Sequence, residues 1–174
     1  MQSQHRETLL TTALLLFALL LQSTLFQLVS INGVVPDIAL IVLIFASYRK
    51  GTRVGLVSGF FSGFFEDFMS LTPLGFNSLV RTIIGFLYGL LYGSFVIDTI
   101  LIPILFTIVA TIMKAFLSWL TSFLFAVKEA NIFFLHFNLL IEVIYNSILA
   151  PFIFGLLKLF RMYRDGEKEK VRQF

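Results

Sequence analysis

The chain has 174 residues, of which 58% are hydrophobic and 13% are charged, and its mean hydropathy is +0.94. These values exclude an ordinary soluble domain and are typical of a protein that lies mostly within a membrane. The net charge of +3 comes from Lys and Arg residues that flank apolar segments, so we do not expect a nucleic-acid partner. Cysteine is absent, which excludes disulfide bonds and thiol chemistry.

Six apolar segments, each bounded by charged or turn-forming residues, predict an all-α membrane protein with six transmembrane helices. We place the helices at residues 9–29, 34–48, 54–69, 82–97, 103–127 and 139–160. No small-residue cleavage site follows the first segment, so we interpret it as an uncleaved helix rather than a secretory signal. Residues 1–160 then form one transmembrane domain, and residues 161–174 form a basic tail.

The distribution of basic residues predicts the orientation of these helices, because Lys and Arg in short loops favour the cytoplasmic side. In the six-helix layout, the loops and tails on one side of the membrane carry ten Lys and Arg residues, and the loops on the other side carry two. Lys114 is not counted, because it lies inside a predicted helix. The ten are Arg6, Arg49, Lys50, Arg53, Lys158, Arg161, Arg164, Lys168, Lys170 and Arg172, and the two are Arg81 and Lys128. Both termini are therefore predicted to be cytoplasmic, with the tail against anionic lipid.

Two consecutive predicted helices repeat glycine at every fourth position. The glycines are Gly55, Gly59 and Gly63 in the segment 54–69, and Gly85, Gly89 and Gly93 in the segment 82–97. In lipid, such ladders of small residues allow helix backbones to approach closely and associate. The two ladders predict close packing, either within this bundle or against another protein.

The segment 54–69 also carries a polar face. At 100° per residue, Ser58, Ser62 and Glu66 fall on one stripe beside the glycines, and Asp67 lies at its edge. Phenylalanines take the opposite side. A carboxylate within a span is costly and usually faces a bundle interior or a wet cavity, so Glu66 and Asp67 are candidates for a functional or partner-binding role. Alternatively, they reach the outer water and only end the helix.

Lys114 lies near the middle of the segment 103–127, where an ammonium group needs a carboxylate partner or a path to the interface. Glu66 and Glu142 are its expected partners, in a structural ion pair or in a relay. His136 has no metal-ligand neighbours, and no catalytic motif is present. We expect no cofactor, no metal and no enzymatic activity; the alternative is an intramembrane enzyme that uses Glu66, Asp67 or Glu142 as a base.

Four segments of the chain stand out together. They are PDIAL at residues 36–40, RKGTR at 49–53, GLVSGFFSGFFEDFMSLTPLGFNSL at 55–79, and NSILAP at 146–151 before the basic tail. In this order and spacing they resemble the family of the rod shape-determining protein MreD. The element from Glu66 and Asp67 to Pro73 and Gly75 is the most specific part of the resemblance. The other family-like positions are Pro36, Asp37, Asn146 and Pro151.

The resemblance implies a non-enzymatic scaffold in the bacterial inner membrane that takes part in cell elongation. Its partner would be MreC, and directly or through MreC it would join RodA, a class B penicillin-binding transpeptidase and the MreB filament in the rod complex that builds peptidoglycan. The resemblance also implies a bundle similar to the substrate-binding subunits of energy-coupling-factor transporters. Glu66, Asp67 and Asn77 would then line either a pocket or a docking surface.

Two alternatives remain open at this stage. The chain could be a vitamin-binding subunit of an energy-coupling-factor transporter, although Ala13 and Ala18 are five residues apart and do not form the Ala-x3-Ala element that such subunits use for docking. The basic tail could contact MreB rather than lipid.

Overall fold

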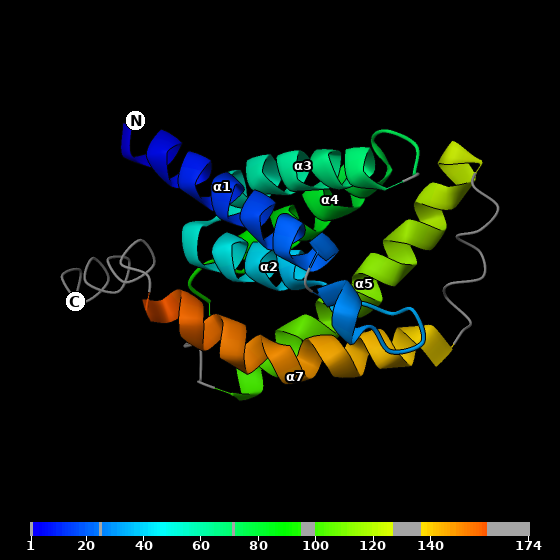
Figure 1. Cartoon of the computed structure of the whole chain (residues 1–174). Helices are drawn as coiled ribbons and strands as arrows, with labels where there is room; N and C mark the ends of the chain where they lie inside the picture. The colour runs from blue at the N-terminus through cyan, green and yellow to red at the C-terminus, as the bar shows by residue number, and fades with distance from the viewer. Residues whose placement is uncertain (1, 25, 71, 95–99, 127–136, 160–174) are drawn as a thin grey trace.

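The computed structural model describes residues 2–24, 26–70, 72–94, 100–126 and 137–159 (Figure 1). Over these residues the chain forms six α-helices and one short 3-10 helix, with no strand beyond an isolated bridge between Ile31 and Val34. The helices are α1 (Gln2–Thr24), η1 (Phe26–Val29), α2 (Ile38–Lys50), α3 (Thr52–Met69), α4 (Phe76–Leu90), α5 (Leu101–Phe125) and α7 (Phe137–Leu159). The prediction of an all-helical protein is confirmed.

Three of these helices are long and apolar enough to cross a bilayer, namely His5–Thr24 within α1, Leu101–Phe125 and Phe137–Leu159. Their outward faces carry large apolar side chains, as expected for helices in contact with lipid. On α5 these include Leu101, Leu105, Ile112, Phe116 and Leu120, and on α7 they include Leu140, Ile144, Ile148, Phe152 and Leu156. The chain is therefore a membrane protein.

Helix α2 forms the centre of the molecule and packs against α1, α3, α4, α5 and α7 (Figure 1). Every residue from Ala39 to Tyr48 is buried. Such a helix must be apolar on all sides, which its sequence IALIVLIFASY satisfies. At 13 residues α2 is only about 20 Å long, but because it contacts protein rather than lipid its length need not match the bilayer.

The fourth helix differs most from the sequence-based layout, because α4 spans Phe76–Leu90 instead of residues 82–97. Asp67 binds the first backbone N–H groups of α4 and so fixes its start earlier than hydropathy suggests. Arg81 consequently lies inside a helix and is buried, whereas the sequence placed it in an outer loop.

Helix α1 begins at Gln2, seven residues before its expected start, and α2 begins at Ile38, four residues after its expected start. Helices α3, α5 and α7 each begin two residues before the expected start, and α7 continues through Pro151. Helix α1 ends at Thr24, and the 3-10 helix η1 follows it where a longer α-helix was expected. Lys128, His136 and the tail 161–174 lie outside the described residues.

The two ends of the bundle differ in charge. The beginning of α1, the junction of α2 and α3, and the end of α7 lie at one end, on the left of Figure 1. These segments carry Arg6, Arg49, Lys50, Arg53 and Lys158, and Lys50 Nζ pairs with Glu7 Oε1 at 2.8 Å. The carboxylates Asp37, Glu66 and Asp67 belong to segments at the opposite end.

Candidate functional site

The two glycine ladders bring α3 and α4 into direct backbone contact. A Cβ atom added at Gly55 would lie 2.1 Å from the carbonyl oxygen of Gly85, and one at Gly59 would lie 2.5 Å from that of Arg81. Gly63 and Gly89 are equally close to α4 and α3 backbone atoms, whereas Gly93 lies beyond the end of α4. This contact leaves no room for another protein between the ladders, and it places the polar end of α3 beside the first turns of α4.

Asp67 closes the turn between these two helices. Its carboxylate accepts hydrogen bonds from three backbone N–H groups at the start of α4 and from the hydroxyl of Thr72. The three N–H groups belong to Gly75, Asn77 and Ser78, at 2.9, 2.8 and 3.2 Å. The N-terminus of a helix has unpaired donors and a positive dipole end, so a carboxylate stabilises it.

Two family-like residues shape the same turn. Gly75 has φ +97°, a left-handed conformation that glycine adopts without strain, and the carbonyl of Pro73 accepts a hydrogen bond from the N–H of Phe76 at 3.1 Å. The Asn77 amide donates to the Thr72 hydroxyl at 3.1 Å. Asp67, Pro73, Gly75 and Asn77 therefore act together in building the start of α4.

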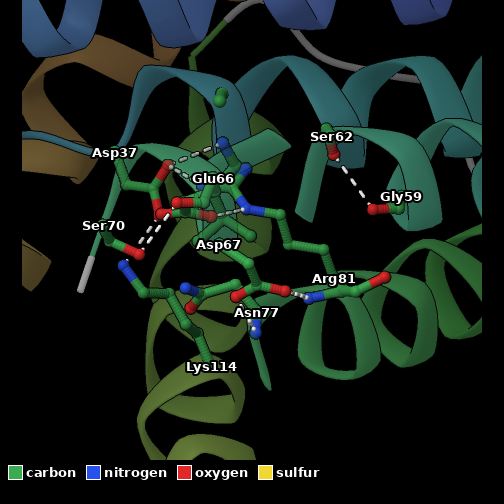
Figure 2. Close-up of polar contacts among 12 residues, drawn as sticks. Asp37, Gly59, Ser62, Glu66, Asp67, Ser70, Asn77, Arg81 and Lys114 are labelled. Atoms are coloured by element: carbon green, nitrogen blue, oxygen red, sulfur yellow. Dashed lines mark hydrogen bonds and ion pairs between the residues drawn. The ribbon is translucent and has the colours of Figure 1, made fainter. Parts of the chain in front are cut away.

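Asp37 is the centre of a separate network of buried charges (Figure 2). It precedes α2, and its Oδ1 accepts from the N–H of Leu40 at 2.9 Å, as an N-cap residue does. The same oxygen accepts from Arg81 Nη2 at 3.0 Å, and Oδ2 accepts from Lys114 Nζ at 2.7 Å. Asp37 thus joins α2 to α4 and α5.

Each cation also binds a second carboxylate. Arg81 Nε donates to Glu66 on α3, and Lys114 Nζ donates to Glu142 Oε1 on α7 at 2.7 Å. The resulting chain of ion pairs runs Glu66, Arg81, Asp37, Lys114, Glu142 and connects five helices. Lys114 has the expected partner Glu142, but its second partner is Asp37, because Arg81 binds the expected partner Glu66.

Asn146 on α7 extends the network by two hydrogen bonds. Its Oδ1 accepts from the N–H of Asp37 at 2.8 Å, and its Nδ2 donates to Thr111 Oγ1 at 3.1 Å. An unpaired amide within a bundle would be costly, so these bonds fix the position of α7 against α2 and α5. Pro151 lies more than one turn further along α7, away from these contacts.

Two network residues were not selected as charge partners from the sequence. Asp37 stands directly before an apolar run, which is the position of an N-cap, and this pattern was available as a signal. Arg81 would be predicted as a buried charge only if the fourth helix were predicted to begin directly after the turn at residues 72–75. With that start, Arg81 lies more than one turn inside α4.

The five charged side chains of the network differ in how far they are exposed. The side chains of Asp37, Arg81 and Glu142 are 2%, 3% and 4% exposed, whereas those of Glu66 and Lys114 are 21% and 22% exposed. Arg81 Nη1 is buried with no hydrogen-bond acceptor among the described residues. Desolvated charges stay ionised only when they are paired, so the pairs hold the five helices in one arrangement.

Glu66 also lines a small open cleft of about 170 Å³ between the end of α1, η1 and the end of α3. The other lining residues are Leu19, Gln22, Ser23, Gln27, Val35, Met69 and Ser70.

Ser58 and Ser62 were predicted on the same face of the helix as Glu66, but they do not line this cleft and are buried. The Ser58 hydroxyl accepts a hydrogen bond from the Thr12 hydroxyl at 3.3 Å, and the Ser62 hydroxyl donates one to the Gly59 carbonyl.

The fold and the site define a helical membrane protein whose helices are joined by buried ion pairs. The family model for the rod shape-determining protein MreD matches residues 3–160, and the chain belongs to this family. The resemblance noted from the sequence is confirmed, and the chain has a role in rod-shape determination. The search of curated proteins and the search of solved structures each gave no match.

Proposed function

We propose that the protein is a non-enzymatic scaffold of the bacterial rod complex that binds MreC in the inner membrane. Through MreC or directly, it helps to position RodA and a class B penicillin-binding transpeptidase near MreB. The observation that carries this proposal is membership of the MreD family over residues 3–160. The chemistry agrees with it, because the carboxylates of the network are paired with cations rather than placed beside a nucleophile.

The proposal includes six membrane-crossing helices with both termini in the cytoplasm. Its support is the basic residues at the end of the bundle where α1 begins and α7 ends. Helices α2, α3 and α4 are shorter than the other three, and the burial of α2 removes the need for it to span the full hydrocarbon layer alone.

A partner helix requires an outward apolar face. The ladders of α3 and α4 are occupied by each other, so the available faces are the phenylalanine face of α3 and the outer apolar faces of α1, α4, α5 and α7. On α3 the exposed phenylalanines are Phe60, Phe61, Phe65 and Phe68. Aromatic side chains are enriched at protein interfaces, which favours the α3 face for MreC.

Affinity purification in mild detergent tests this function. The tagged protein is isolated from its native membranes, and co-eluting proteins are identified by mass spectrometry. We expect MreC together with RodA and a transpeptidase. Recovery of paired ATPases with a coupling membrane subunit would instead identify a vitamin transporter and contradict the scaffold.

Matched variants locate the binding face. We expect Phe61→Ala with Phe65→Ala on α3 to reduce MreC recovery at least about tenfold, whereas Leu105→Ala with Ile112→Ala on α5 leaves it unchanged. Both pairs lie on exposed faces, so neither opens a core cavity. Equal recovery from both double variants would exclude the α3 face but not the scaffold function.

A further inference from the structure

The buried network contains one more carboxylate than cations. Asp37, Glu66 and Glu142 face Arg81 and Lys114, which leaves one negative charge uncompensated if all five groups are ionised. A net charge in a protein interior is costly, so the arrangement favours a further positive group nearby.

Glu66 is the carboxylate of this network that such a group can reach. Both oxygens of Asp37 are bonded to cations, and Glu142 is nearly closed off from the surface. Glu66 has one oxygen bound to Arg81, is 21% exposed and lines the cleft. The cleft therefore gives a small molecule direct access to the excess negative charge.

The cleft lining indicates the chemistry of the occupant. Beside Glu66 the lining includes Gln27, Ser23 and Ser70, whose amide and hydroxyl oxygens can accept hydrogen bonds from an ammonium group. The side-chain oxygen of Gln22, which also lines the cleft, already accepts from the N–H of Ala39 at 3.3 Å. A divalent metal ion would require more oxygen ligands and more carboxylate charge than one glutamate. Leu19, Val35 and Met69 add apolar surface that suits a short carbon chain.

The size of the cleft restricts the occupant further. Its volume of about 170 Å³ corresponds to the space of roughly five or six water molecules, well below the 300 to 1,000 Å³ typical of pockets for drug-sized ligands. This space is of the size of a two-carbon amine. Met69 lines the cleft and is also 48% exposed on the outer surface, so the cleft adjoins the apolar face of α3.

We propose that this cleft binds a primary ammonium group on a short carbon chain through Glu66. The ammonium belongs either to the ethanolamine headgroup of a phospholipid, whose acyl chains lie against the apolar surface beside Met69, or to a free alkylamine. Binding compensates the excess charge of the network and thereby stabilises the contact of α1 with α3. This site does not depend on MreC binding.

Two measurements on the purified full-length protein test the site and separate the two sources. The thermal unfolding midpoint is followed in detergent with ethanolammonium chloride and with sodium chloride at equal ionic strength. Native mass spectrometry counts bound lipid after addition of phosphatidylethanolamine or phosphatidylglycerol. A saturable rise in the midpoint with ethanolammonium supports a free amine, and selective retention of phosphatidylethanolamine supports the lipid. No preference for the ammonium compound in either measurement would overturn the proposal.

Three variants connect the effect to the cleft. Glu66→Gln removes the charge at nearly constant shape and should weaken binding at least about tenfold. Because it also breaks the pair with Arg81, Ser23→Phe serves as a second variant that fills the cleft and leaves every ion pair in place. Glu7→Gln removes a carboxylate at the opposite end of the bundle and should leave binding unchanged. Full binding by both Glu66→Gln and Ser23→Phe would exclude this cleft.

Discussion

Arg81 is the most deeply enclosed cation of the network, and it bridges Asp37 and Glu66. Replacing it with methionine leaves the buried Asp37 and the half-buried Glu66 without this partner, and breaking a buried pair from one side costs about 3–5 kcal/mol. We therefore predict that Arg81→Met strongly lowers the thermal unfolding midpoint in detergent. Arg6→Met makes the same change at an exposed position of α1 and should cost about 0.5 kcal/mol or less. Similar midpoints for the two variants would show that the network does not stabilise the fold.

Asp67 acts on a single helix end rather than on the whole network. Asp67→Ala removes the acceptor for the N–H groups of Gly75, Asn77 and Ser78, and we predict a loss of about 1–3 kcal/mol. Hydrogen exchange should become faster at the Asn77 and Ser78 amides, with little change at amides in the middle of α5. Asp67→Asn keeps a carbonyl acceptor and should give a smaller effect. Unchanged exchange in the alanine variant would contradict the capping role.

At the scale of elements, the contact between α3 and α4 depends on the absence of side chains at the ladder glycines. A methyl group at Gly59 would overlap the carbonyl of Arg81 at 2.5 Å, so Gly59→Ala should separate the helices and destabilise the protein by about 1–3 kcal/mol. Gly155 on α7 has open space around its Cβ position. Gly155→Ala should be neutral or stabilising by up to about 1 kcal/mol, because alanine favours the helix. The thermal unfolding midpoints of the two variants separate the effect of packing from that of helix propensity, because both variants make the same substitution within a helix. Equal midpoints for Gly59→Ala and Gly155→Ala would refute the tight contact.

At the scale of the whole molecule, the charge difference between the two ends predicts the orientation in the membrane. The chain has no cysteine, so a single introduced thiol reports its own location. In intact cells with a permeable outer envelope, Leu28→Cys on η1, 86% exposed in the wild type, should react with a membrane-impermeant maleimide. Arg53→Cys at the start of α3 should react only after the inner membrane is opened. The reverse pattern would place the termini outside the cytoplasm.

The sequence by itself determined the features that depend on neighbouring residues. Long apolar segments predict helices, glycine at every fourth position predicts a small-residue face, and the segments 36–40 and 55–79 resemble the MreD family; each of these signals lies within one stretch of chain. The position of α4 was misjudged because hydropathy does not register a capping carboxylate several residues upstream. The local pattern nevertheless placed Glu66 and Lys114 among the charges that matter.

Only the tertiary structure decided which charges meet. Asp37 lies 44 residues from Arg81 and 77 from Lys114 along the chain, and these groups come together through the packing of α4 and α5 around α2. Hydropathy and helical periodicity specify which face of a helix is polar, but not its depth or rotation against its neighbours. The depth and rotation of the helices are set by the close contact of α3 with α4 and by the buried charges. Because an unpaired buried charge is costly, only packings that pair these charges are stable.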